Sequence, residues 1–241
     1  MVDDPKTVLF VSSSSEGLRI DSEIQSIQNQ LNRYRPQKQQ IIKFATCLAS
    51  TASGLRRALT DYKPYILHFS GHGAGRKGIF LEHEDGTRRV LPTSLLADLC
   101  SYFSEYVKCV VLNACFTTYQ AYEIVRHIDY VIGMRQAISD PIAISYSAAF
   151  YDSLAAGENV PNAHRLACWD LQANYPEKIA PERVRENAIA VSDIPNSVLV
   201  HDNPVLVVRD PGDEVPHVHQ TPTSLSHISD YSLATLKKLC E

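Results

Sequence analysis

The sequence lacks the charge and hydrophobic patterns that mark several large classes of protein. Its longest basic runs are pairs, and its net charge is −4, with 23 Lys and Arg against 27 Asp and Glu. Nucleic acids and anionic membranes are bound through concentrated positive charge, so neither is expected as a main partner. No apolar stretch approaches the roughly 20 residues that a membrane-spanning helix requires.

The cysteines also lack a pattern. Six of them are scattered through the 241 residues without CxxC spacing, at positions 47, 100, 109, 115, 168 and 240. Neither a zinc site nor a CxxC redox motif is therefore predicted. The opening segment, MVDDPKTVLFVSSSS, does not have the basic-then-apolar layout of a signal peptide. We expect reduced thiols and a cytoplasmic location.

Motifs for cofactors are missing as well. The polar run from Ser12 to Ser15 follows an apolar segment, but it lacks the glycines that let backbone amides wrap a phosphate. His217 and His219 are two potential metal ligands without a third. We expect neither a cofactor nor a metal.

Short β-like and helical segments alternate along most of the chain. The run from Thr7 to Val11 is apolar and β-branched, and from Ile20 to Leu31 isoleucine and leucine recur at helical spacing. Further strands are predicted at 40–46, 65–73, 108–115, 130–134 and 205–208, further helices at 48–62, 119–127, 141–156, 161–173 and from Pro92, and a hairpin at 78–90. This alternation predicts an α/β fold with a mainly parallel central sheet and helices on both faces.

The pattern changes near Arg209. Residues 1–209 are predicted to form one domain, and the Pro-, His- and Ser/Thr-rich residues 210–228 a linker. Residues 229–241 begin a helical pattern with Leu233, Leu236 and Cys240 on one face. A helix of about 12 residues is not stable alone. This segment therefore either docks on the domain or begins a helical module that this chain lacks.

Two reactive side chains are predicted at the C-terminal tips of buried strands. The segment YILHFSGHG brings His72 to one tip, and KCVVLNAC brings Cys115 to another. Open α/β sheets place their chemistry at this edge. The pairing of a histidine with a cysteine suggests a cysteine protease.

A nucleophilic cysteine needs help to ionise, because a free thiol has a pKa near ~8.5. Cys115 precedes a predicted helix, whose amides can stabilise a thiolate. His72 lies between Gly71 and Gly73, which lets the amide of Gly73 approach a substrate carbonyl. Taken alone, Cys115 fits a structural cysteine at a strand end, and His72 a structural or solvated histidine. The structural interpretation is preferred for Cys47, Cys100, Cys109 and Cys168, and a core position for His68.

The segments HFSGHG at 68–73 and VVLNAC at 110–115 resemble those of CHAT domains, the bacterial relatives of caspases and separase. The likeness extends over TVLFVSSSSEGLRIDSEIQSI and YVIGMRQAISDPIAISYSAAFYDSLAAG, from about Lys6 to Val208. It implies a caspase-like fold and a Cys-His dyad peptidase, with Cys115 as nucleophile and His72 as catalytic histidine. It also implies that the amides of Gly73 and Cys115 form the oxyanion hole.

The resemblance extends to the substrate pocket. Caspase relatives place a residue that reads the P1 side chain two positions before the cysteine, which here is the neutral Asn113. Asp140 matches a separase-like aspartate that faces a basic P1 residue, so its presence in the pocket would imply Arg or Lys at P1. The alternative role for Asp140 is an N-cap before Pro141, worth ~1 kcal/mol.

The C-terminal ISDYSLATLKKLCE resembles the start of the helical effector-associated modules that accompany CHAT domains in bacterial conflict and immune systems. It implies a regulated effector that cleaves protein or peptide substrates and is gated by a protein partner. Two alternatives stay open. One is a catalytically silent adaptor with the same fold, and the other is a TIR-like NAD hydrolase, which would leave His72 and Cys115 without a role.

Overall fold

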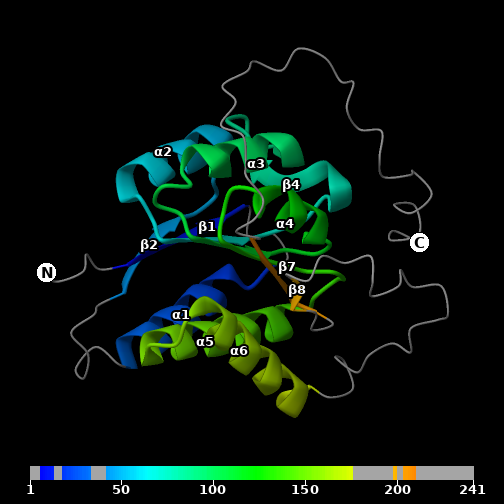
Figure 1. The fold of residues 1–241 in the computed structure, drawn as a ribbon. Helices are drawn as coiled ribbons and strands as arrows, with labels where there is room; N and C mark the ends of the chain where they lie inside the picture. The colour runs from blue at the N-terminus through cyan, green and yellow to red at the C-terminus, as the bar shows by residue number, and fades with distance from the viewer. Residues whose placement is uncertain (1–5, 14–17, 34–41, 176–197, 200–202, 210–241) are drawn as a thin grey trace, which may run out of the picture.

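The computed structural model describes residues 6–13, 18–33, 42–175, 198–199 and 203–209. Within these ranges a seven-stranded sheet with the order β2-β1-β3-β6-β7-β9-β8 lies between two layers of helices (Figure 1). The first five of these strands are parallel, and β9 runs antiparallel to β7 and β8. The predicted α/β class with a mainly parallel sheet is confirmed. The strands are β1 (Thr7–Ser12), β2 (Lys43–Cys47), β3 (Ile66–Ser70), β6 (Cys109–Asn113), β7 (Tyr130–Gly133), β8 (Val198–Leu199) and β9 (Val205–Val208).

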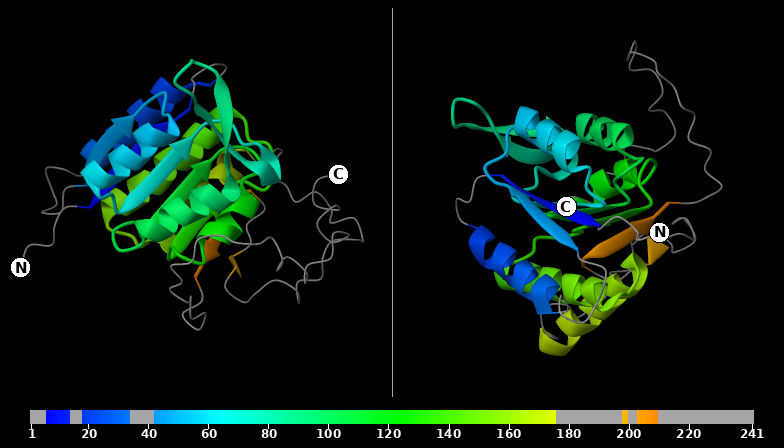
Figure 2. Two further views of the ribbon diagram at one scale, coloured as in Figure 1. Left: turned by 90° about the horizontal axis from the view of Figure 1, so that it is seen from above. Right: turned by 90° about the vertical axis from the view of Figure 1, so that its left-hand side faces the viewer.

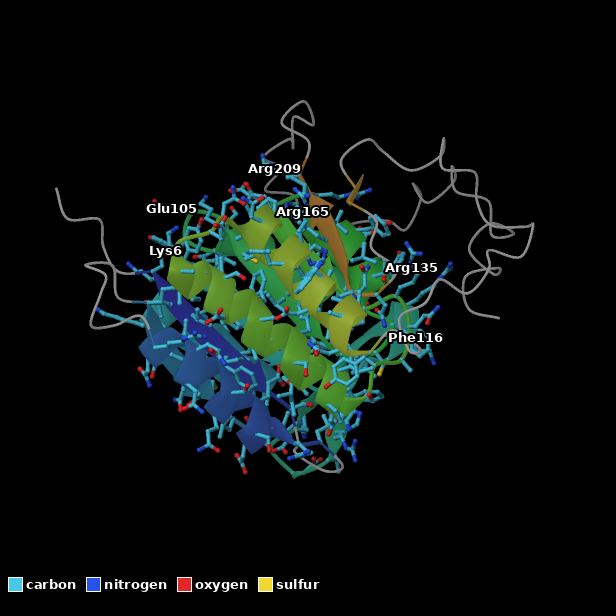
Figure 3. All side chains as sticks on the ribbon, turned by 90° about the horizontal axis from the view of Figure 1, so that it is seen from below. Lys6, Glu105, Phe116, Arg135, Arg165 and Arg209 are labelled. Atoms are coloured by element: carbon cyan, nitrogen blue, oxygen red, sulfur yellow. The ribbon has the colours of Figure 1, made fainter. Side chains whose placement is uncertain are left out.

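Helices cover both faces of the sheet, as predicted. On one face lie α1 (Ile20–Arg33), α5 (Asp140–Ala156) and α6 (Val160–Asn174), which Figure 3 shows side by side. On the other lie α2 (Ala52–Tyr62), α3 (Thr93–Tyr102) and α4 (Thr118–Ile124), together with the short 3-10 helix η1 (Gly75–Lys77) and the hairpin of β4 (Gly78–Glu82) and β5 (Arg88–Pro92) (Figure 2). Within the described ranges, none of the helices is both long and apolar enough to cross a membrane.

The alternation of side chains along each strand divides the core in two. In β1, Leu9 and Val11 belong to the apolar cluster beneath α2, α3 and α4, whereas Val8 and Phe10 belong to the cluster beneath α1, α5 and α6. All four side chains are fully buried. Because both faces of β1 are covered, the sequence shows a continuous apolar run there and not a polar-apolar alternation.

Three predicted boundaries are wrong in informative ways. The strands expected to reach His72 and Cys115 end two residues earlier, at Ser70 and Asn113, so both reactive residues lie in loops beyond the sheet. Asp140 is the first residue of α5, and the N-cap is Ser139. The proposed capping role of Asp140 is therefore wrong. Residues 210–228 and 229–241, which carry the predicted linker and helical segment, lie outside the described residues.

Candidate active site

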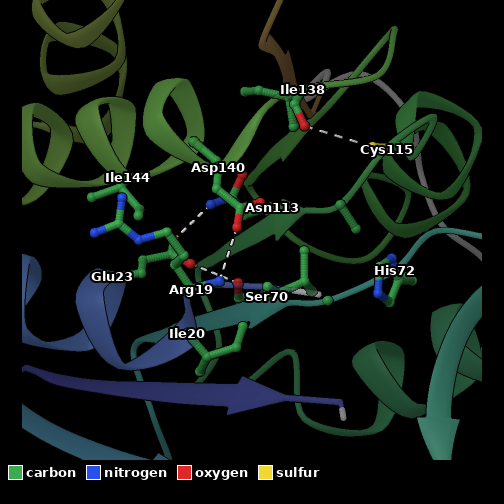
Figure 4. A pocket seen from close by; sticks show the side chains of 14 residues that line it. Arg19, Ile20, Glu23, Ser70, His72, Asn113, Cys115, Ile138, Asp140 and Ile144 are labelled. Carbon is green, nitrogen blue, oxygen red and sulfur yellow. Dashed lines mark hydrogen bonds between the residues drawn. The ribbon is translucent and has the colours of Figure 1, made fainter. Parts of the chain in front are cut away.

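The strand register brings the two predicted catalytic residues to neighbouring positions. In the parallel pair of β3 and β6, Ser70 lies opposite Asn113. Beyond this pair the amide of Gly71 donates to the carbonyl of Asn113 at 3.4 Å. His72 lies two residues after Ser70, and Cys115 lies two residues after Asn113. Both line the same pocket at the C-terminal edge of the sheet (Figure 4).

Gly73 packs directly against the backbone of Cys115. A Cβ atom at Gly73 would lie 1.9 Å from the carbonyl oxygen of Cys115 and 3.1 Å from its carbonyl carbon. The contact is between two backbones, so a side-chain rotation cannot relieve the clash. Glycine is therefore required at this position if the loops that carry His72 and Cys115 are to approach so closely.

The amides proposed for the oxyanion hole are not used by the surrounding fold. Gly73 lies opposite Ile79 in an antiparallel bridge whose hydrogen bonds are made by its neighbours, Ala74 and His72. Across the described ranges, neither the amide of Gly73 nor that of Cys115 donates a hydrogen bond to the protein. Two unengaged donors beside a cysteine have the chemical properties that oxyanion stabilisation requires.

The turn that follows Cys115 is held by bonds to the chain after β7. Phe116 adopts a left-handed backbone with φ 57°. The amides of Thr117 and Thr118 then donate to the carbonyl of Met134 at 2.8 and 3.2 Å. The chain that follows β7 therefore engages two of the amides at this turn, those of Thr117 and Thr118.

The cysteines differ in their access to solvent. Cys100 and Cys168 are buried, and burial raises the pKa of both thiols to about 12. Burial also raises the pKa of the Cys109 thiol, and these three cysteines accordingly fit the structural role predicted for them. Cys115 is partly exposed, with its Sγ 3.9 Å from the carbonyl oxygen of Ile138. Cys47 is also partly exposed, but it does not line the pocket.

The pocket also contains a buried carboxylate that the sequence did not single out. Glu23 of α1 is 3% exposed. Its Oε1 accepts hydrogen bonds from Asn113 Nδ2 at 2.6 Å and Ser147 Oγ at 2.7 Å, and its Oε2 accepts from Ser70 Oγ at 2.6 Å. The Nε2 atom of His68 lies 3.1 Å from Oε1. The signal in the sequence was a glutamate at a helical spacing that places it on the apolar stripe of α1.

These donors decide the charge state of Glu23. Burial alone would raise its pKa, but the contact with His68 and the hydroxyl donors Ser70 and Ser147 outweigh burial, so the pKa lies below its ordinary value. In the Nε2–H tautomer His68 donates to Glu23, while its Nδ1 accepts from the Tyr151 hydroxyl at 3.0 Å. Glu23 is therefore ionised at neutral pH, and the core position predicted for His68 is confirmed.

Both residues predicted for the substrate pocket line it. Asn113 is 5% exposed, and its Nδ2 also lies 3.3 Å from Ser147 Oγ. Asp140 is partly exposed, and its Oδ2 accepts a hydrogen bond from the backbone amide of Arg19 at 2.9 Å. That bond connects the start of α5 to the start of α1 across the pocket.

The pocket has a cavity volume of about 40 Å³, enough for a few water molecules. A substrate side chain would therefore have to displace water and move lining side chains when it enters. The lining comes from the ends of β3 and β6 and the starts of α1 and α5: Leu18, Arg19, Ile20, Glu23, Ser70, Gly71, His72, Asn113, Ala114, Cys115, Ile138, Asp140, Ala143 and Ile144.

Comparison with curated proteins finds two relatives named as proteases. A Roc-COR-CHAT protease from an unknown prokaryotic organism is 26% identical over 179 residues, which cover 69% of this chain and 16% of that protein. A probable protease from Gillisia limnaea is 28% identical over 200 residues, which cover 79% of this chain and 34% of that protein. The alignments thus span well under half the length of either relative. No family model matches the sequence.

Among solved structures, the ADP complex of Bacillus subtilis pyridoxal kinase aligns with a TM-score of 0.37 and 11% identity, over 68% of this chain and 89% of the kinase. A likeness at this level carries no argument about function. The relationship rests on sequence: the protease-named relatives align over 69% and 79% of this chain. They agree with the resemblance of HFSGHG and VVLNAC and support the assignment of the chain as a CHAT domain, consistent with its mainly parallel α/β fold.

Proposed function

We propose that this CHAT domain is a cysteine endopeptidase in which Cys115 is the nucleophile and His72 its catalytic partner. The observation that carries the proposal is the contact of Gly73 with the backbone of Cys115, which holds the two loops together at one pocket. The proposal is also supported by a histidine and a partly exposed cysteine just beyond the ends of adjacent parallel strands, because nucleophilic catalysis by a thiol uses a nearby base.

The reaction would proceed through an acyl-enzyme. The sulfur of Cys115 attacks the scissile carbonyl carbon, and the resulting oxyanion accepts hydrogen bonds from the amides of Gly73 and Cys115. His72 either removes the thiol proton or polarises the carbonyl, and the amine product leaves with a proton. Water then hydrolyses the thioester and regenerates the thiol. Loss of one oxyanion donor typically costs about 10²–10³ in rate.

We further propose that the P1 residue is Arg or Lys. The pocket lining includes two carboxylates, those of Glu23 and Asp140, and one guanidinium, that of Arg19. Four hydrogen-bonding groups surround the carboxylate of Glu23, whereas within the described ranges the carboxylate of Asp140 accepts a hydrogen bond only from the backbone amide of Arg19. The carboxylate of Asp140 is therefore the better candidate for contact with a cationic P1 side chain.

The test is cleavage of a peptide library by the wild-type protein and by Cys115→Ala. We expect cleavage after Arg or Lys by the wild type and its complete loss in Cys115→Ala, with an unchanged circular dichroism spectrum. Cys47→Ala is the matched control and should cleave normally, because Cys47 is a partly exposed thiol outside the pocket. Cleavage that survives in Cys115→Ala would rule out this nucleophile.

The remaining part of the proposal concerns regulation. We propose that residues 1–209 form the peptidase domain, that residues 229–241 recruit a regulatory protein partner, and that the protein acts in the cytoplasm as a conflict or immune effector. Removal of residues 229–241 should leave the peptidase fold intact and abolish activation by the partner. Unchanged activation after this deletion would exclude the segment as the recruiting element.

A further inference from the structure

Glu23 joins four structural elements at one point beneath the pocket. It belongs to α1, and its hydrogen-bonding groups are Ser70 and His68 of β3, Asn113 of β6 and Ser147 of α5. A buried carboxylate is costly unless its oxygens are hydrogen-bonded. Here each oxygen has at least one donor, at distances from 2.6 to 3.1 Å. Both oxygens of the carboxylate are therefore satisfied, and Glu23 is not an accidental buried charge.

The carboxylate fixes which way the Asn113 amide points. Its Nδ2 lies 2.6 Å from Glu23 Oε1, and a carboxylate accepts hydrogen bonds only. Exchange of the amide nitrogen and oxygen would place two oxygens in contact and remove a charge-assisted bond. Ser147 Oγ, at 3.3 Å, is a second neighbour of the same nitrogen. The orientation of Asn113 is therefore determined by Glu23.

The other end of that amide has no partner. Asn113 Oδ1 is buried, and within the described ranges it accepts no hydrogen bond. An unpaired buried acceptor is costly, and such atoms require an explanation in a folded protein. Asn113 lines the pocket two residues before Cys115, where a P1 side chain is proposed to enter (Figure 4). A donor on that side chain would supply the missing partner.

We propose that Glu23 is a positioning residue, which holds Asn113 so that its Oδ1 accepts a hydrogen bond from an N–H donor at the end of the P1 side chain. This inference rests on the proposed peptidase function and deepens it. Asp140 would read positive charge, whereas Asn113 would read the presence of a donor. The pocket then accepts Arg and Lys best, and it distinguishes neutral side chains with an N–H group, such as citrulline or glutamine, from norleucine.

The proposal is tested by binding in the Cys115→Ala protein, where the peptidase reaction does not occur. Fluorescein-labelled tripeptides that end in Arg, citrulline, norleucine or Asp are titrated and followed by fluorescence anisotropy. We expect affinity to decrease from Arg to citrulline to norleucine. Asn113→Ala should weaken both Arg and citrulline by about tenfold to hundredfold relative to norleucine, the range for a hydrogen bond in a desolvated site. Equal losses for all peptides, or no binding at all, would overturn the proposal.

The role of Glu23 is tested separately by Glu23→Gln, which preserves shape and removes charge. The matched control is Glu158→Gln, just beyond the C-terminal end of α5 and 11 residues after Ser147, which is about 16 Å along the helix axis. In ¹⁵N-labelled protein, the side-chain amide signal of Asn113, identified by its loss in Asn113→Ala, should move in Glu23→Gln and stay in place in Glu158→Gln. Discrimination of citrulline from norleucine should fall with it.

If Glu23→Gln does not fold, Ser147→Ala tests the same point, because it removes one donor to Glu23 and one neighbour of Asn113. An unmoved Asn113 signal in the folded variant would refute the positioning role. Preferred binding of the Asp-ending peptide would also refute it, because Arg19 and not Asn113 would then contact the P1 side chain. Wild-type protein that cleaves no peptide while the binding order holds would refute the peptidase function and leave this inference standing.

Discussion

Replacement of Gly73 by alanine tests the geometry of the site most sharply. The new Cβ would lie 1.9 Å from the carbonyl oxygen of Cys115, whereas real Cβ atoms essentially never approach closer than 3.0 Å. The two loops would therefore have to separate by about 1 Å, since both partners in the clash are backbone. His72 is the residue immediately before Gly73, so the movement displaces the proposed catalytic histidine and one proposed oxyanion donor together.

The expected cost can be estimated from both effects. A misplacement of about 1 Å typically lowers the rate about 10²-fold, and loss of one oxyanion donor costs about 10²–10³. Because the two effects arise from one movement, we expect kcat/KM to decrease by about 10²–10³ and not by their product. The loop lies outside the sheet, so overpacking should cost about 1–3 kcal/mol in unfolding free energy and leave the protein folded.

The assay is peptide cleavage combined with thermal unfolding, and Gly86→Ala is the control. Gly86 has φ 76° in the β4–β5 hairpin, and a Cβ added there meets nothing within 4 Å. Gly86→Ala should therefore lower the free energy of unfolding by about 1–2 kcal/mol through backbone strain alone and leave cleavage unchanged. If Gly73→Ala retained activity within a factor of three of the wild type, the close approach of Gly73 to Cys115 would not belong to the catalytic site.

Three further predictions concern the residues that line the pocket. Asp140→Ala should remove the preference for Arg over citrulline at P1 in a peptide library; an unchanged preference would leave Asp140 as a partner of the Arg19 amide alone. His72→Ala should reduce cleavage to background while the protein stays folded, as circular dichroism would show. Because folding lowers the pKa of Glu23 below 4.5, its ionised form stabilises the native state above that pH, and this contribution is lost as the pH falls through the lower folded pKa. Urea unfolding of Glu23→Gln should therefore vary less with pH below 4.5 than that of the wild type, and equal slopes would contradict this.

The fold class could be predicted from the sequence because its signals are local. Apolar β-branched runs alternate along the sequence with segments whose apolar residues have helical spacing. A parallel sheet covered on both faces follows from that alternation. The predicted ends of the strands are less accurate. His72 and Cys115 continue apolar segments, yet the sheet ends at Ser70 and Asn113, because the chain bends at Gly71 and turns at Phe116. The sequence does not show where ladder hydrogen bonds stop.

The contacts of Glu23 at the bottom of the pocket could not be predicted, because they join distant parts of the chain. Glu23 looked like an ordinary helical glutamate until α1 was packed beside α5 and beneath β3 and β6. Its donors Ser70, Asn113 and Ser147 come from three different elements. Similarly, the capping role for Asp140 followed from the adjacent Pro141, whereas its actual partner is the distant backbone of Arg19. Local patterns cannot reveal such pairings.

The central claim, that Cys115 is an activated nucleophile in a peptide-binding pocket, is tested most directly by covalent labelling. A peptidyl acyloxymethyl ketone with Arg at P1 is reacted with the intact protein, and the modified cysteine is identified by mass spectrometry. We predict labelling at Cys115, abolished by His72→Ala, with little at the partly exposed Cys47. Equal labelling of Cys47 and Cys115, or labelling of Cys115 that persists in His72→Ala, would contradict the account.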